Sequence, residues 1–288
     1  MYAALTMLLL SGLSALLIGW AYFGRYKLPR PPIGVFNLWD VALVMVGILL
    51  VPYLYLALPL WLVATLLALS TVSLLATYFQ PVLNDPLATW AITLVLGGAE
   101  VATFLALGAD NPLHFAVNNC VQLIAAITIA NLWAQSGLTA RDAAILSGAL
   151  VLYDTLFTLL LPFMDALFGH LAALPFAPLV AWPLLDGRWV AIGLGDLILA
   201  TVFPLALRKE AGQTAGIVAL VLTGLVLSGL LWLPTLGRWQ ATFPVMVVLG
   251  PLQLSLYGGW RWWHSTAPAM HHARRTCTAS WRAFGSVG

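Results

Sequence analysis

Apolar stretches about as long as a bilayer is thick follow one another almost from end to end of this chain. Of its 288 residues, 62% are hydrophobic and only 8% are charged, whereas a soluble domain carries about a quarter charged residues. A bilayer core of roughly 30 Å needs about 20 apolar residues per helix, and each spanning segment must satisfy its own backbone polar groups. The sequence therefore predicts an all-α polytopic membrane helix bundle and excludes a soluble globule.

Proline, glycine and charge clusters divide the chain into nine predicted transmembrane spans. The expected spans are 4-22, 38-57, 60-79, 88-108, 113-134, 143-161, 189-207, 213-233 and 241-258. Together they form one membrane domain, residues 1-264, and the polar residues 265-288 are predicted to be a cytoplasmic tail. The first span carries its positive charges after it rather than before it, so we expect it to be retained rather than cleaved as a signal peptide.

The Lys and Arg residues sort sharply between the two sides when nine spans are assumed. One side receives ten of the 12: Arg25, Lys27, Arg30, Arg141, Arg208, Lys209, Arg261, Arg274, Arg275 and Arg282. The other side has Arg188 and Arg238 alone. Because short cytoplasmic loops carry the excess of positive charge, the N-terminus is predicted to be outside and the C-terminus in the cytoplasm.

Net charge and loop length indicate where the chain resides. The net charge of +2 is small and unevenly spread, so it favours orientation in a lipid bilayer rather than a nucleic-acid partner. The short loops are compatible with a multi-pass protein of a prokaryotic plasma membrane. The sequence leaves the oligomeric state open.

Three acidic residues lie well inside predicted spans, namely Glu100, Asp154 and Asp196. No Lys or Arg lies inside any predicted span to pair with them. An ionised carboxylate at the bilayer centre costs about 2.5 to 3.5 kcal/mol on insertion scales, so such residues usually face a polar interior and mark a functional site.

Asp154 and Asp196 are expected to lie at the same depth. The sixth span ends at Pro162, eight residues after Asp154, and the seventh begins near Arg188, eight residues before Asp196. At about 1.5 Å per residue, each aspartate would be roughly 12 Å below the same membrane face in antiparallel helices. Two carboxyl groups within reach share a proton and titrate as a unit, so one can act as base and the other as acid to activate water against a peptide carbonyl.

The residues next to the two aspartates favour close approach of another chain. Asp196 ends the sequence Gly193-Leu194-Gly195-Asp196, in which two glycines let a helix or an extended substrate come near the backbone. Asp154 follows Tyr153, whose hydroxyl can hydrogen-bond a carboxylate or a substrate.

The Tyr-Asp and Gly-Leu-Gly-Asp motifs resemble the signature of the presenilin and signal peptide peptidase family, the GxGD intramembrane aspartyl proteases. Those proteins also have nine spans, with Tyr-Asp in the sixth, GxGD in the seventh and a Pro-Ala-Leu motif at the start of the ninth. Pro244-Val245-Met246 is similar to that third motif. A less favoured alignment uses Pro251-Leu252-Gln253.

The resemblance implies an intramembrane aspartic endopeptidase with Asp154 and Asp196 as its catalytic pair, and Pro244-Val245-Met246 as the segment that positions the substrate. The predicted orientation is that of signal peptide peptidase rather than presenilin. The expected substrates are therefore transmembrane helices that enter with their N-terminus in the cytoplasm, including remnant signal peptides. No cofactor is expected.

Between the two catalytic spans, residues 162-187 contain four prolines. That many prolines disfavour a transmembrane helix. The segment is predicted to be an interfacial loop or a short re-entrant hairpin, and it can serve as a gate, as a strand that pairs with an unwound substrate, or as a simple connector.

The remaining polar residues are assigned mainly structural roles. Glu100 is expected to be a hydrogen-bonded acid between helices, with an influence on the aspartate pair left open. The string His114, Asn118, Asn119 and Gln122 is expected to join helices by hydrogen bonds. His271, His272 and Cys277 have no second ligand cluster at metal-site spacing, so no metal is expected.

Two other functions are compatible with the buried acids. A prepilin-type peptidase also uses a GxGD aspartate, but near the cytoplasmic face and often with a large cysteine-bearing loop. A proton-coupled transporter or channel would use the acids as a proton relay, although no inverted repeat is evident. The absence of H-E-x-x-H and G-x-S-G motifs disfavours zinc and serine intramembrane proteases.

Overall fold

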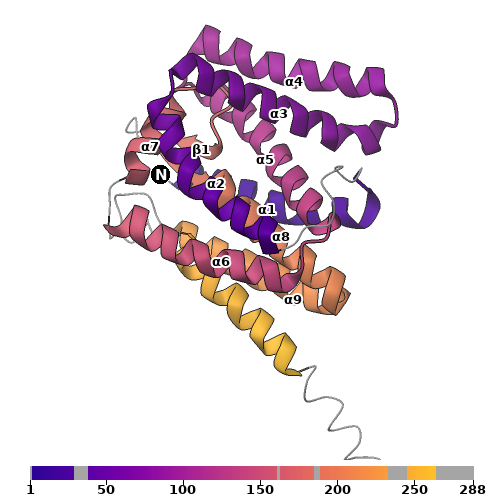
Figure 1. Cartoon of the computed structure of the whole chain (residues 1–288). Coiled ribbons are helices and arrows are strands. Elements are labelled where there is room, and N and C mark those ends of the chain that lie inside the picture. The colour runs from indigo at the N-terminus through magenta and orange to yellow at the C-terminus, as the bar shows by residue number, and fades with distance from the viewer. Residues whose placement is uncertain (1, 29–37, 161–162, 185–188, 233–244, 264–288) are drawn as a thin grey trace, which may run out of the picture.

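A computed structural model of the chain describes residues 2–28, 38–160, 163–184, 189–232 and 245–263. These residues form a helical bundle with one two-stranded sheet (Figure 1), which confirms the predicted all-α class. The elements are α1 (Tyr2–Arg25), α2 (Leu38–Ala57), α3 (Leu60–Leu83), α4 (Pro86–Leu107), α5 (Pro112–Gln135), α6 (Ala140–Asp154), the π-helix η1 (Thr155–Leu160), α7 (Phe163–Ala172), β1 (Leu179–Pro183), β2 (Trp189–Gly193), α8 (Leu194–Ala211) and α9 (Gln213–Trp232). A last helix covers residues 246–263.

Six of these helices, α1 to α5 and α9, are long and apolar enough to cross a membrane. They indicate a multi-pass membrane protein. Each of the three other expected spans contains a helical segment among the described residues, namely α6 with η1, α8, and residues 246–263. The expected tail, residues 265–288, lies outside the described residues.

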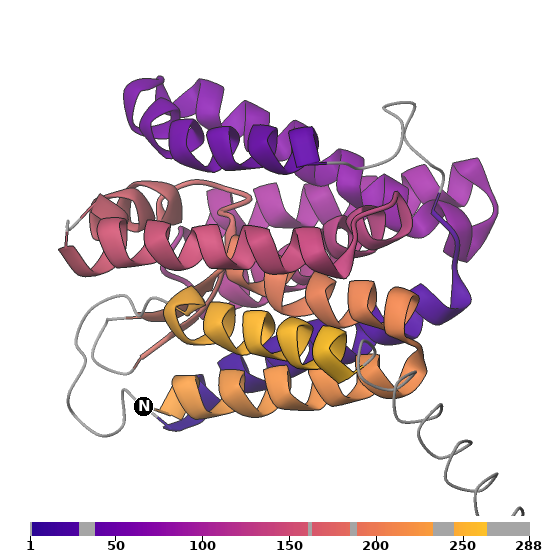
Figure 2. The ribbon, with the colours of Figure 1, turned by 60° about the horizontal axis from the view of Figure 1, so that its bottom comes forward.

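Helix α5 lies at the centre of the bundle and is the most buried of the six apolar helices. It packs against α1, α3, α4, α8 and β1. Helices α3 and α4 form an outer layer (Figure 1), whereas the last helix, shown in yellow, lies beside α6 on the opposite side (Figure 2).

Local sequence signals set the beginnings of three helices. Side-chain oxygens of Asp85 and Asn111 accept the backbone N–H two residues on, and a proline follows each as the first helical residue. Thr139 and Asp142 form a reciprocal capping box at the start of α6. These caps end the loops between α3 and α6 without burying unsatisfied backbone groups.

The segment between the two aspartate-bearing helices differs from the prediction. Residues 163–172 are helical, and β1 pairs with β2 antiparallel, with Leu179 opposite Gly193 and Pro183 opposite Trp189. The expectation that the seventh span is helical from residue 189 is therefore wrong, because residues 189–193 are a strand and α8 begins at Leu194. Short apolar runs are compatible with either structure, and the partner across the sheet decides between them.

Packing of the last helix against α6 depends on Gly250. A Cβ atom there would overlap the Val151 side chain and lie 2.9 Å from the Ser147 carbonyl oxygen. We expect Gly250→Ala to destabilise the fold by about 1–3 kcal/mol, the usual cost of overpacking, measured as a lower thermal unfolding midpoint in detergent. Gly258→Ala on the same helix is the control, since its Cβ meets nothing within 4 Å. An equal midpoint for both variants would contradict this packing.

Candidate functional site

Asp154 is the last residue of α6, where the α-helix changes into the π-helix η1. Such π-helical turns are often found at functional sites. The carboxyl group is 8% exposed and its Oδ2 accepts a hydrogen bond from the Met246 backbone N–H at 3.1 Å. The N-terminus of the last helix thus directs the Met246 N–H at Asp154, and a helix N-terminus favours a negative charge beside it.

Asp196 lies in the first turn of α8, three residues after the N-cap Gly193. A Cβ atom on Gly193 would lie 3.3 Å from Asp196 Oδ2, so the glycine leaves this carboxylate room. Asp196 is therefore near the start of its helix, not eight residues inside it as the sequence predicted.

Both aspartates line one cavity of about 480 Å³, and their carboxyl groups are near enough to interact electrostatically. The cavity has one wall from α2, a second from α6 and η1, and a third from α7, the start of α8 and Met246. The side chains around the pair are mostly apolar, and no Lys or Arg is among the described lining residues.

The other motif residues meet at the same cavity. Tyr153, Gly193, Leu194 and Gly195 all line it, and the Tyr153 ring packs on Phe157 with 4.8 Å between ring centroids. The two motifs picked out in the sequence are about forty residues apart in the chain, and the fold brings them to one cavity.

The segment expected to position a substrate is only partly described. Pro244 lies outside the described residues. Val245 and Met246 are both buried, and Met246 lines the cavity.

The alternative segment lies elsewhere. Gln253 is buried two turns further along the last helix, where it accepts a hydrogen bond from Ser147 of α6 and donates to the Leu199 carbonyl of α8 at 3.3 Å. Gln253 does not line the described cavity. Of the two alignments, the one on Val245 and Met246 has its residues beside Asp154.

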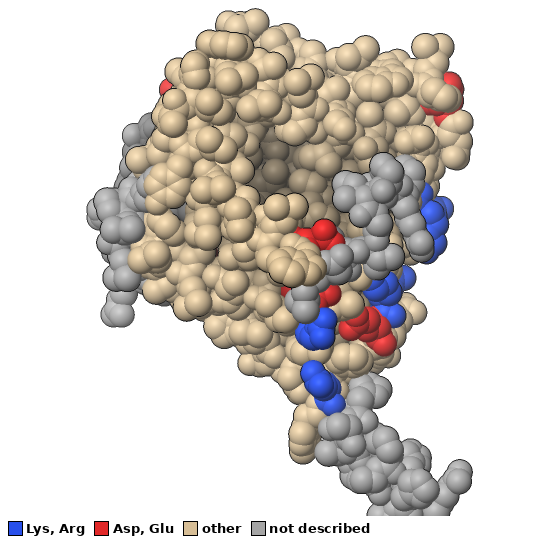
Figure 3. Space-filling model, in the orientation of Figure 1, with Lys and Arg blue, Asp and Glu red and all other residues tan. Residues whose placement is uncertain are grey.

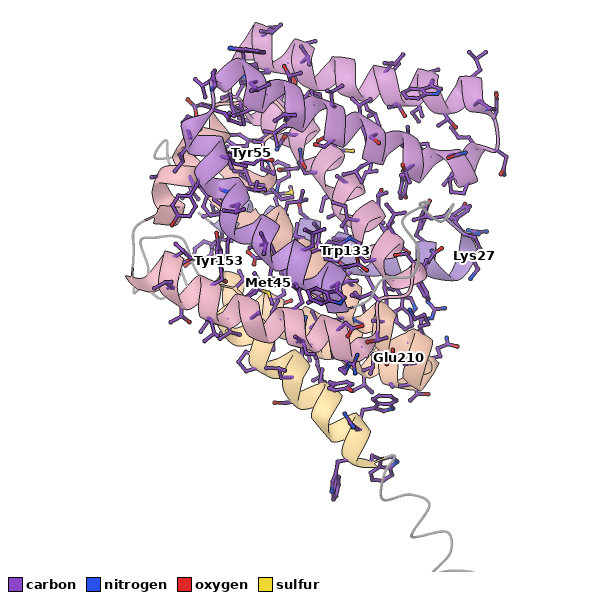
Figure 4. The ribbon with its side chains drawn as sticks, viewed as in Figure 1. Lys27, Met45, Tyr55, Trp133, Tyr153 and Glu210 are labelled. Carbon is purple, nitrogen blue, oxygen red and sulfur yellow. The ribbon has the colours of Figure 1, made fainter. Side chains whose placement is uncertain are left out.

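Motif reasoning missed the α2 wall of the cavity, which includes Gly47, Val51 and Tyr55. Figure 4 shows Tyr55 on α2 and Tyr153 on α6, both toward the side of the molecule away from Lys27 and Glu210. The α2 residues of this wall belong to a continuous apolar run, so nothing in the sequence distinguished them from residues that face lipid.

The polar string of α5 joins another helix only in part: His114 Nδ1 lies 3.7 Å from Glu100 Oε1 of α4, whereas Asn118 and Asn119 bind the hairpin segment. Asn118 donates to the carbonyls of Ala177 and Leu179, and Asn119 donates to the carbonyl of Ala181, so both bind strand β1 or the residues just before it. Glu100 is fully buried and accepts the Phe176 N–H at 3.1 Å. These side chains therefore hold the segment that leads to the site.

Two neighbouring carboxyl groups in an apolar cavity can perform general acid–base chemistry on a bound water. Among the described residues, no group of three or more His, Cys, Asp or Glu side chains is arranged to hold a metal ion. His271, His272 and Cys277 lie outside the described part of the chain.

Comparison with known proteins adds no further constraint on this site. No protein-family model matches the chain, and no curated protein matches it.

Proposed function

We propose that the chain is an intramembrane aspartic endopeptidase that hydrolyses peptide bonds within transmembrane segments or remnant signal peptides. The observation that carries the proposal is that Asp154 and Asp196, from two helices of a membrane bundle, line one apolar cavity. Placing two acids in an apolar cavity of a membrane bundle costs free energy, and acids in such places usually mark a functional site.

In this mechanism the pair holds one proton between its two carboxyl groups. The ionised member takes a proton from water as the water oxygen attacks the peptide carbonyl carbon. The protonated member gives its proton to the carbonyl oxygen, which yields a tetrahedral diol. As the diol collapses, the member that is now protonated gives its proton to the leaving amine, the C–N bond breaks, and the ionised member takes a proton from one diol hydroxyl, which yields the carboxylic acid and restores the singly protonated pair.

The edge of β2 offers a place for an extended substrate. Ala181 directs its N–H and carbonyl toward Asn119, so the pair Ala181–Ala191 is not hydrogen-bonded across the sheet. The N–H and carbonyl of Ala191 therefore face away from β1, and among the described residues no third strand pairs with β2. A substrate strand added at this edge would run toward Asp196, which is three residues beyond the strand end.

Substrate positioning is assigned to Pro244, Val245 and Met246. Support comes from Met246, whose N–H binds Asp154 and whose side chain lines the cavity. A side chain or backbone group here would contact the residues on either side of the scissile bond.

The proposal includes nine spans, with the N-terminus outside and the C-terminus in the cytoplasm. The Lys and Arg residues of the described part of the chain, Arg25, Lys27, Arg141, Arg208, Lys209 and Arg261, are near the ends of α1, α8 and the last helix and the start of α6. In Figure 3 the Lys and Arg side chains that are visible, in blue, gather at one side of the molecule. A single basic side supports a cytoplasmic face there.

The direct test is cleavage of a labelled type II transmembrane peptide by the purified protein in detergent, with product masses read by mass spectrometry. We expect a cut inside the apolar segment that a transition-state-mimicking aspartyl protease inhibitor blocks. Absence of cleavage across several such peptides by folded protein would overturn the proposal and favour a proton-coupled transporter.

A further inference from the structure

Side chains of α5, rather than a third strand, occupy the outer edge of β1. The Ala181 N–H donates to Asn119 Oδ1 at 2.8 Å, and Asn119 Nδ2 donates to the Ala181 carbonyl at 2.7 Å. This two-way exchange imitates a hydrogen-bonded residue pair between antiparallel strands. Asn118 Nδ2 donates to the carbonyls of Ala177 and Leu179 at 3.2 and 3.0 Å.

A third side chain holds the chain just before β1. Glu100 Oε1 accepts the Phe176 N–H at 3.1 Å, and His114 Nδ1 lies 3.7 Å from the same oxygen. Phe176 has a φ of 59°, in the left-handed region, which costs a residue with a side chain about 1 kcal/mol or more. Such a conformation persists only where its surroundings impose it, and the buried Glu100 is one of the groups that does so.

Backbone hydrogen bonds connect this anchored segment to the aspartate pair. Leu179 is opposite Gly193 in the sheet, and the Leu194 N–H donates to the Pro178 carbonyl at 3.1 Å. Gly193 in turn lies against the Asp196 carboxylate, whose Oδ2 is 3.3 Å from the position that a Cβ atom on Gly193 would take. A shift of the start of β1 would therefore move the first turn of α8 and with it Asp196.

Glu100 is an unusual residue for its helix. Helix α4 is otherwise among the least buried of the apolar helices, yet Glu100 is fully buried. A carboxyl group there is costly, and apolar packing of α4 would not require it.

We propose that Glu100, Asn118 and Asn119, here called the hairpin clasp, are positioning residues that hold Asp196 in register with Asp154 through the β1–β2 hairpin. The effect of the clasp on kcat rests on the proposed proteolytic function. Whether the clasp holds the hairpin in place can be tested without an activity assay.

Hydrogen–deuterium exchange tests the connection directly. In Asn119→Leu, we expect amides of residues 176–183 and also 193–196 to exchange about tenfold or more faster, since a buried donor and acceptor on Ala181 lose their partner. The matched control is Asn131→Leu on the same helix. Asn131 is also buried, but it donates to the Gly19 and Ile127 carbonyls, away from the hairpin.

Kinetics separate positioning from general destabilisation. We expect Asn119→Leu and Glu100→Leu to lower kcat about tenfold to a hundredfold with KM within about twofold, because small displacements of a catalytic group reduce rate more than binding. Glu100→Gln, which keeps an acceptor oxygen for the Phe176 N–H, is expected to retain most of the rate. Asn131→Leu should leave the kcat of the remaining folded protein unchanged.

The outcomes distinguish the clasp from the protease. Unchanged exchange at residues 193–196 in Asn119→Leu would overturn the clasp, even if cleavage fell. Equal loss of kcat in Asn119→Leu and Asn131→Leu would also overturn it. If the wild-type protein cleaves no peptide, the proposed function fails, and the exchange experiment still decides whether the clasp holds the start of α8.

Discussion

Asp154→Asn and Asp196→Asn will each abolish peptide cleavage, with kcat reduced at least about a thousandfold, while the protein stays folded. General acid–base catalysis contributes about 10²–10⁴-fold, and residues that act as a unit lose nearly the whole effect when either is removed. An amide at position 154 can still accept the hydrogen bond that the Asp154 carboxylate receives from the Met246 N–H. Single-turnover cleavage of the labelled transmembrane peptide measures the effect.

Thermal unfolding in detergent supplies the control for these two variants. We expect each midpoint to be equal to or above that of the wild type, because the substitution removes a carboxyl group from an apolar cavity. The double variant should be no slower than either single variant. Near-normal cleavage by either single variant would contradict the shared-proton mechanism.

Gly195→Leu will remove activity while leaving stability unchanged or raised. Gly195 lines the cavity beside Asp196, and a Cβ atom on it would meet nothing within 4 Å. Leucine in a helix is favoured over glycine by roughly 1 kcal/mol or less, so we expect no loss of folding stability from the substitution. The added side chain would instead fill space that a substrate needs, and we expect kcat/KM to fall about a hundredfold or more.

Gly98→Leu is the matched control, because this exposed glycine of α4 also has open space at its Cβ and lies outside the cavity. It should keep full activity. Gly193→Ala should lower activity more than Gly195→Ala does. A Cβ atom at position 193 would lie 3.3 Å from Asp196 Oδ2 and displace the carboxylate, whereas one at position 195 meets nothing within 4 Å. Full cleavage by Gly195→Leu would show that substrate does not pass over this face of α8.

The helical class and the identity of the two aspartates were readable from the sequence. Apolar runs of bilayer length permit little besides helices, since lipid offers the backbone no hydrogen-bond partner. An acid inside such a run is costly wherever the helix lies. That criterion selects Glu100 as well as the two aspartates, and the Tyr-Asp and Gly-Leu-Gly-Asp motifs at matched expected depth then distinguished Asp154 and Asp196.

The position of Asp196 along its helix was not readable in the same way. Residues 189–193 are an apolar run that continues into α8 without a break in composition. They form a strand because residues 179–183 lie opposite them.

The hydrogen bonds of the clasp could not be predicted from the sequence either. Glu100 is 76 positions before Phe176, and Asn119 is 62 positions before Ala181. A buried asparagine has the same sequence signal whether its partner is a helix carbonyl or a strand edge.

What the sequence by itself determined was thus which segments are long and apolar enough to be helical in a membrane, and which acids lie inside them at a cost in free energy. Tertiary structure alone decided where α8 begins, which wall α2 contributes to the cavity, and which side chains hold the hairpin. The physical reason is that run length and charge burial are properties of one segment, whereas strand pairing and cavity lining depend on groups far apart in the chain.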